Sequence, residues 1–171
     1  MATRKRLLTG ARISVDRVTV ATPSGPVARD VVVHPGAVVI LPVLDDGRVV
    51  LIRNRRVAVG ETLLELPAGT LTPGEAPERC ARRELAEETG YRASAMAPLL
   101  SFYPSPGVLD EVMHGFVATG LTAGAQDLDP GEEIAVEPMD RGALDDALAR
   151  GAIKDGKTLT LLLWWERFGR D

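Results

Sequence analysis

The segment PERCARRELAEETG, residues 77 to 90, carries the most sharply bounded helix signal in the chain. Its initial proline suits the first helical turn, where the missing N–H costs nothing, and its final glycine is typical of a helix end. At about 100° per residue, Glu87 lies roughly 60° to one side of Glu84, and Glu88 lies roughly 40° to the other. The sequence therefore predicts a helix that gathers three mutually repelling carboxylates on one face.

Two explanations of that acidic face stay open from the helix alone. An oxygen-rich cluster is what hard cations such as Mg²⁺ or Mn²⁺ take as ligands. A solvated face is the ordinary reading of a run of charges. The single cysteine, Cys80, excludes an internal disulfide and a cysteine-rich zinc site. Neither His34 nor His114 has a partner at ligand spacing, so zinc is not expected.

Short β-branched runs around this helix predict a sheet. AVVILPVL and RVVLIRN are separated by Asp45-Asp46-Gly47 and predict a hairpin, because Asp-Gly accepts the positive φ of tight turns. Further strands are expected at residues 11–22 and 27–34 and in TLLELP, MAPLLSFY and EVMHGFVA, and helices at 140–150 and 158–168. The layout is a mixed sheet with a few helices, either α+β or α/β.

Length and charge limit the class of protein. A chain of 171 residues forms about one domain with a substantial core. Its net charge of −4 argues against broad nucleic-acid binding. No apolar run approaches the ~20 residues that span a membrane. The basic start lacks the apolar core of a secretory signal. We therefore expect a cytoplasmic protein without nucleic-acid or membrane partners.

The residues on both sides of the helix match a known pattern. Seven glycine or charged positions and one aliphatic position keep a fixed spacing: Gly69, Glu75, Arg83, Glu84, Leu85, Glu87, Glu88 and Gly90. This spacing resembles the signature box of the Nudix hydrolases. One position departs from the family, which usually has an aliphatic residue where Tyr91 stands.

The resemblance implies a fold and a domain organisation. The fold would be the Nudix fold of the α/β class, a mixed β-sheet sandwiched between helices (α/β/α), with antiparallel strands at the N-terminus. Residues 1–171 would form a single Nudix hydrolase domain, with the catalytic core at 37–169. Residues 11–34 would contribute to a homodimer.

The resemblance also implies a metal centre. Mg²⁺ (or Mn²⁺) would be bound by Glu84, Glu87, Glu88 and the backbone carbonyl of Ala68. Arg83 would hold the geometry between the loop and the helix, together with Glu75. Such a cation would neutralise phosphate oxygens and lower the pKa of a bound water.

Segments outside the box resemble the ADP-ribose pyrophosphatase branch of the family. They are the run Glu65 to Gly69 before the box, the loop Ser105 to Glu111 after it, and residues 153–158 near the C-terminus. The branch implies a phosphate contact from Arg56 and a ribose contact from Glu111. Arg29 and Glu65 are further candidate substrate contacts.

The catalytic base of this branch usually lies on an acidic loop well after the box. Here that loop is residues 127–133, in which Glu132 aligns best and Glu133 is the reserve. Solvated loop acids are the ordinary alternative for both. Glu88 and Arg83 complete the expected catalytic set.

The expected substrate is ADP-ribose or a related nucleoside diphosphate sugar, with ADP-ribose cut to AMP and ribose 5-phosphate. GDP-mannose is the alternative substrate. A non-catalytic ADP-ribose sensor is a different class, against which the complete box argues. An RNA 5′-end pyrophosphohydrolase is disfavoured by the acidic charge and the lack of an aromatic and basic stacking surface.

Overall fold

The computed structural model describes residues 2–11 and 13–169. Its strands are β1 (Thr3–Thr9), β2 (Ser14–Thr22), β3 (Gly25–Val33), β4 (Ala37–Pro42), β5 (Val49–Arg56), β6 (Glu61–Glu65), β7 (Ala68–Thr70), β8 (Arg92–Phe102), β9 (Met113–Thr122) and β10 (Ile134–Met139). Its helices are α1 (Pro77–Thr89), α2 (Arg141–Ala149) and α3 (Gly156–Phe168). The strands form three sheets, ordered β1-β2-β3, β10-β5-β6 and β7-β4-β9-β8.

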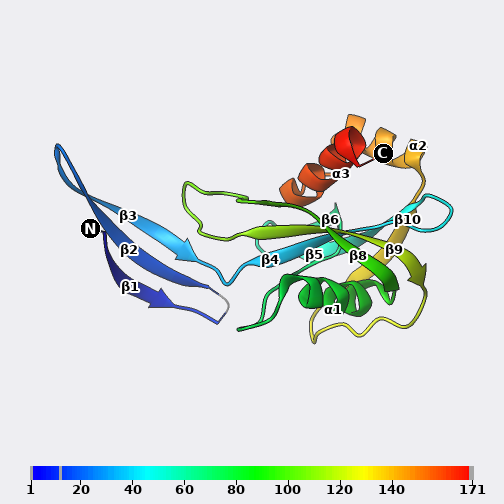
Figure 1. Cartoon of the computed structure of the whole chain (residues 1–171), viewed down its shortest axis with the longest axis horizontal. Helices are drawn as coiled ribbons and strands as arrows, with labels where there is room; N and C mark the ends of the chain where they lie inside the picture. Colours follow the sequence, from blue (N-terminus) through cyan, green and yellow to red (C-terminus); the bar gives the residue numbers. More distant parts are fainter. Residues whose placement is uncertain (1, 12, 170–171) are drawn as a thin grey trace.

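The second and third sheets form a layered body between helices. In Figure 1, α1 lies against one side of these sheets, and α2 and α3 lie on the opposite side. This arrangement confirms the expected mixed α/β sandwich. The helices expected at 140–150 and 158–168 are α2 and α3. The second begins earlier than expected because Asp155 caps it, accepting a bond from the Thr158 N–H.

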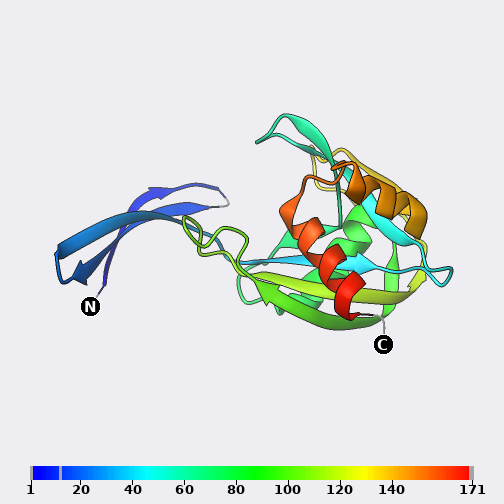
Figure 2. The ribbon, with the colours of Figure 1, turned by 90° about the horizontal axis from the view of Figure 1, so that it is seen from above.

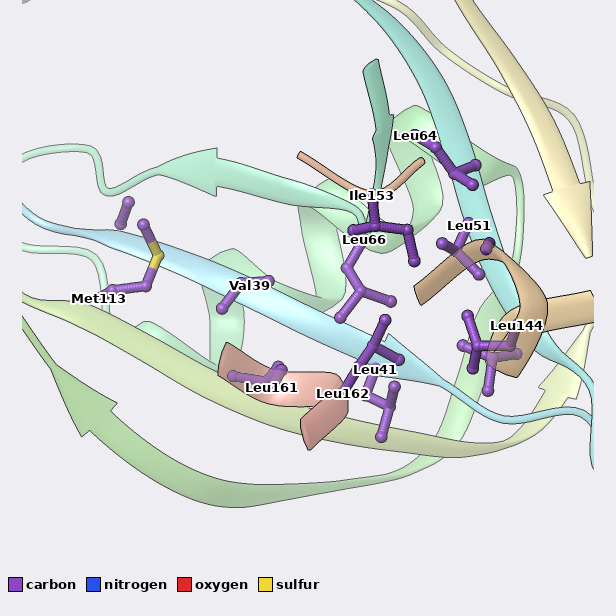
Figure 3. Close-up of a cluster of buried hydrophobic side chains, with 13 residues drawn as sticks. Val39, Leu41, Leu51, Leu64, Leu66, Met113, Leu144, Ile153, Leu161 and Leu162 are labelled. Atoms are coloured by element: carbon purple, nitrogen blue, oxygen red, sulfur yellow. The ribbon is translucent and has the colours of Figure 1, made fainter. Parts of the chain in front are cut away.

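Strand β4 is the centre of the body because both of its faces are buried. Val39 and Leu41 join an apolar cluster with Leu161 and Leu162 of α3 (Figure 3). The alternate residues of β4 pack on the other side, against the apolar face of α1. Side chains alternate between the two faces of a strand, so a continuously apolar run fits a strand that is covered on both sides.

The hairpin expected between AVVILPVL and RVVLIRN is wrong. The turn is present, and Gly47 has the positive φ of 83°. However, β4 pairs with β7 and β9, whereas β5 pairs with β6 and β10. Among the described residues, pairing next to the turn is limited to the bridge between Val43 and Val49 and the bond from the Leu44 N–H to the Arg48 carbonyl. Both runs are too apolar to leave one face in water, so they separate into two sheets whose side chains share one core.

The N-terminal sheet stands apart from the layered body. Figures 1 and 2 both place β1, β2 and β3 to one side, with the loop between β8 and β9 reaching toward them. Val32 exchanges backbone hydrogen bonds with that loop, accepting from Asp110 and donating to Val108. The strands expected at 11–22 and 27–34 are β2 and β3. Strand β1 was not expected, because its sequence TRKRLLT lacks alternating apolar residues.

No helix within residues 2–11 and 13–169 combines the length and the apolar character needed to cross a membrane.

Candidate active site

Helix α1 delivers the acidic cluster. It begins at Pro77 and ends at Gly90, whose φ of 76° closes the helix with an N–H bond to the Ala86 carbonyl. Leu85 and its apolar neighbours face the core, and Glu88 lies on this buried side of the helix. The helix predicted from the sequence is confirmed at both ends.

Arg83 cross-links the box from within. Its guanidinium donates to both carboxylate oxygens of Glu75, each at 3.1 Å, and so ties α1 to the preceding loop. The Nη1 nitrogen donates to Glu84 at 2.7 Å and to Glu87 at 2.9 Å. The two hydrogen bonds from Arg83 to Glu75 lower the pKa of Glu75 to about 2. The supporting role implied for Arg83 and Glu75 fits this arrangement.

Glu88 is a carboxylate buried with little compensation. Its side chain is 3% exposed and accepts one hydrogen bond, from the Ala68 N–H at 2.9 Å. Burial raises its pKa to about 8, and the charges of Glu84 and Glu132 add to the rise. Burial likewise raises the pKa of Glu84. Both groups would be stabilised as anions by a nearby cation.

Gly69 makes room for the Glu84 carboxylate. A Cβ built at residue 69 would lie 1.8 Å from Glu84 Cδ, closer than any two such atoms can approach. The bare backbone of β7 therefore forms part of the cradle around this carboxylate.

The donor set fits a hard divalent cation. Carboxylate oxygens and a backbone carbonyl are the ligands that Mg²⁺ and Mn²⁺ prefer. Across the described residues, no three His, Cys, Asp or Glu side chains are close enough to share one ion as they stand. Glu84 and Glu87 are instead turned toward Arg83. Binding a cation would require these two side chains to rotate from the guanidinium.

A cavity of about 470 Å³ opens over the cluster. Its wall includes the Ala68–Gly69 backbone, the carboxylates of α1, Arg56 of β5, and Ala11 and Pro35 from the N-terminal segment. This volume is within the range of small-molecule sites.

The acidic loop contributes Glu132 to this wall, but not Glu133. Glu132 accepts a hydrogen bond from the Asp129 N–H at 3.2 Å. The base of the loop is fastened to α1: the Asp127 N–H donates to the Glu87 carbonyl, and Gln126 Nε2 donates to the Glu88 carbonyl at 2.6 Å. Sequence reasoning missed Gln126, which carries no motif signal.

Arg56 lines the cavity, and Glu65 is bonded to Arg56 in the interior of the protein. Glu65 is fully buried and accepts from Arg56 Nε at 2.9 Å, Arg56 Nη2 at 2.6 Å and Lys157 Nζ at 2.5 Å. Glu65 is therefore not on the cavity wall, where a substrate contact would have to be. Lys157 lies in the segment 153–158 that resembles the branch, but the sequence predicts no role for this side chain.

The other two expected substrate contacts lie away from this cavity. Glu111 is at the junction with the N-terminal sheet, where its carboxylate lies 3.1 Å from His34 Nδ1. Arg29 is on β3 and donates to the neighbouring Ala28 carbonyl. Neither side chain lines the cavity that holds the α1 carboxylates.

The chain is similar to known proteins over most of its length. A model of the NUDIX domain matches residues 33–162. The chain is similar to an ADP-ribose pyrophosphatase of Bacillus subtilis (strain 168), at 38% identity over 146 residues, which is 85% of this chain and 78% of the relative. It is also similar to a GDP-mannose pyrophosphatase of Cronobacter sakazakii (strain ATCC BAA-894), at 38% identity over 136 residues, which is 74% of this chain and 71% of the relative.

A solved structure of an ADP compounds hydrolase shares the fold. It aligns with a TM-score of 0.80 at 23% identity and covers 99% of this chain and 95% of that chain. The expected Nudix fold is confirmed by this likeness. The domain model spans the whole acidic box, so the chain belongs to the Nudix family and is a Nudix pyrophosphohydrolase.

Proposed function

We propose that the protein hydrolyses the diphosphate of ADP-ribose to AMP and ribose 5-phosphate, with Mg²⁺ or Mn²⁺ as its cofactor. The observation that carries this proposal is the cavity in which the half-buried Glu84 and the buried Glu88 share one wall with Arg56 and Glu132. Breaking a diphosphate requires compensation of phosphate charge and a group that accepts a proton from water. The similarity to an ADP-ribose pyrophosphatase supports this choice of substrate.

The metal ligands in this proposal are Glu84, Glu87, Glu88 and the Ala68 carbonyl. A bound divalent cation would neutralise phosphate charge and favour the ionisation of water. Arg83 donates to both Glu84 and Glu87, which would have to turn from it to hold a cation. Glu75 would keep Arg83 in place through its two bonds to the guanidinium.

Glu132 is the proposed general base, with Glu133 as the reserve. It accepts a proton from the attacking water, whose oxygen bonds to one phosphorus while the bridging P–O bond breaks. Arg56 holds a phosphate: Glu65 takes its Nε and Nη2, and its Nη1 has no bonded partner among the described residues. Arg56 carries its full charge here, because the bond to Glu65 raises its pKa.

We propose that the substrate contacts of Arg29 and Glu111 form in a homodimer. Apart from the contact of Val32 with residues 108–110, the described N-terminal strands pair with one another, and Leu7, Leu8 and Val20 are between 39% and 57% exposed. Exposed apolar side chains of this kind suit an interface. We propose that a second copy covers them, and that Arg29 then serves the partner's cavity. Glu111 would contact the terminal ribose at the same junction.

A second candidate substrate is GDP-mannose, which the similarity to a GDP-mannose pyrophosphatase supports. The two substrates share the diphosphate that the carboxylate wall would hold, so they differ only in groups bound elsewhere. The cytoplasm is the proposed location, which cell fractionation would test.

The deciding experiment is a panel of nucleoside diphosphate sugars, assayed with Mg²⁺ or Mn²⁺ and with product identification. We expect the highest kcat/KM for ADP-ribose, with AMP and ribose 5-phosphate as products. Highest turnover of GDP-mannose would favour the second candidate. Binding of ADP-ribose without any hydrolysis would contradict the enzyme assignment.

A further inference from the structure

Four charged side chains form one connected chain from helix α3 to the cavity. Arg56 is bonded to Glu65 through two nitrogens, and Glu65 accepts a further bond from Lys157 at 2.5 Å. Lys157 Nζ also lies 2.9 Å from an Asp155 carboxylate oxygen. The signs alternate along the chain, beginning with the positive Arg56 on the cavity wall.

The central members of this chain are hidden from water. The Glu65 side chain is fully buried, and that of Lys157 is 12% exposed. A buried carboxylate is costly unless its oxygens are bonded and its charge is balanced. Glu65 meets this condition with three donors, two from one arginine and one from Lys157. Because one Glu65 oxygen accepts from both Arg56 and Lys157, the two cations jointly fix the plane of the carboxylate.

We propose that Lys157 is a positioning residue for Arg56, acting through Glu65. Lys157 holds the Glu65 carboxylate in the plane that keeps Arg56 Nε and Nη2 bonded and leaves Nη1 available on the cavity wall. This inference rests on the proposed contact between Arg56 and a substrate phosphate. It assigns a function in substrate binding to α3, a helix on the opposite side of the body from α1.

Loss of Lys157 leaves the Glu65 carboxylate more dependent on its hydrogen bonds from Arg56. The buried carboxylate loses one of its three donors. Arg56 then becomes the only bonded partner of the carboxylate among the described residues, and the carboxylate is free to turn and draw the guanidinium inward. The phosphate contact weakens, while the carboxylates of α1 and the base on the loop stay as they are. The effect therefore falls on KM rather than on kcat.

Two neighbouring contacts provide matched controls. Lys154 forms an exposed pair with Glu61 at 2.5 Å, so it also links the segment before α3 to β6. Thr158 is buried beside Lys157 and accepts a bond from the Leu66 N–H at 2.8 Å. Both join the same two parts of the fold, but neither is bonded to Glu65 or Arg56. Changes at Lys154 report on the stability of the junction alone. Thr158 Oγ1 also donates to Asp155 at 2.6 Å, so changes at Thr158 report on the junction and on the outer end of the chain, away from Arg56.

The test compares Lys157→Met, Lys154→Met and Thr158→Val in the full chain, with kcat, KM and Tm measured on the best substrate of the panel. We expect Lys157→Met to raise KM about tenfold with kcat within about threefold of wild type. Lys154→Met should leave KM unchanged, and Thr158→Val should lower Tm without raising KM. Lys157→Arg keeps a cationic donor, so its KM should stay close to the wild-type value. Lys157→Gln replaces the Met variant should the latter fail to fold.

A second readout does not depend on the substrate. The Nε–H signal of Arg56 in a ¹H–¹⁵N spectrum, assigned by its loss in Arg56→Lys, should shift in Lys157→Met and stay in place in Lys154→Met. An unchanged signal together with an unchanged KM would overturn the inference. If Arg56→Met itself leaves KM unchanged, the proposed phosphate contact is wrong. A large rise of KM in Arg56→Met, with no change of KM in Lys157→Met, would refute only the positioning role of Lys157.

Discussion

Gly69 and the carboxylate of Glu84 lie so close that residue 69 has no room for a side chain: a Cβ there would be 1.8 Å from Glu84 Cδ. Gly69 is paired with Val38 of the central strand, and Glu84 is held by Arg83 on α1. The Glu84 carboxylate therefore occupies the space that a side chain at residue 69 would take. The glycine in the sheet permits this position of one proposed ligand.

Gly69→Ala should consequently disable the site. The methyl group displaces the Glu84 carboxylate, so we expect kcat/KM to fall at least about tenfold. The displaced atoms are the far end of the flexible Glu84 side chain, so the free energy of unfolding should change little. Kinetics and urea unfolding would measure the two effects. Gly107→Ala is the control, because a Cβ at Gly107 meets no atom within 4 Å. Normal kinetics in Gly69→Ala would contradict the close approach.

Glu88→Gln and Glu84→Gln should each lower kcat by orders of magnitude while the fold is retained. Each substitution removes a charged oxygen from the proposed cation site but keeps the size of the side chain. Excess chelator should abolish the activity of the wild type, and added Mg²⁺ or Mn²⁺ should restore it. Circular dichroism would check the fold. Full activity in chelator or in either variant would contradict the metal assignment.

Local features of the fold were predictable from the sequence, and long-range pairing was not. Helix α1 was predicted to the residue because Pro77 and Gly90 mark its ends by local backbone preferences. The turn at Gly47 was likewise correct. The pairing partners of β4 are decided by burial across the whole body. The residues around Gly47 do not encode which strands those partners are.

The same division holds for the site. Glu84, Glu87 and Glu88 share one helix face, so their proximity follows from the helical period. Glu65 and Lys157 are 92 residues apart in sequence, and only the docking of α3 on β6 brings them together. The sequence segment Glu65 to Gly69 predicts a substrate contact from Glu65, although the side chain is fully buried.

Glu75→Gln should alter the dependence of stability on pH. The folded pKa of about 2 lies below the ordinary value of 4.5, so the ionised carboxylate stabilises the fold. This contribution is complete above pH 4.5 and is lost as the pH falls toward 2. We expect the variant to be less stable at pH 7 and to lose less stability between pH 4.5 and 3, as measured by urea unfolding.

Glu78→Gln is the control for that experiment. Glu78 is on the same helix, but both side chains of its ion pair with Arg82 are exposed. Exposed ion pairs contribute about 0–1 kcal/mol to the free energy of unfolding. Equal pH profiles for wild type and Glu75→Gln would show that the bond to Arg83 carries no net stabilisation.

Deleting residues 1–34 should abolish both dimerisation and turnover of ADP-ribose. The deletion removes the exposed apolar sheet that we propose a second copy covers. It also removes Ala11 from the cavity wall. Light scattering and kinetics would measure the two losses. The substitution Leu8→Asp, on an exposed strand of the intact chain, should weaken the dimer and leave the core folded. A monomeric truncated protein with normal kinetics would contradict this prediction.

Glu132→Gln should reduce kcat by about 10²–10⁴-fold, with KM and metal affinity nearly unchanged, because a general base acts mainly in the transition state. Glu132 is on the cavity wall, its charge contributes to the raised pKa of Glu88, and its loop is fastened to α1 through Gln126. Glu133→Gln and Glu111→Gln are the controls, and Glu111→Gln should raise KM more than it lowers kcat. A larger kcat loss in Glu133→Gln would move the base by one residue along the same loop. If neither loop variant loses more than a few-fold in kcat, the base must instead come from α1.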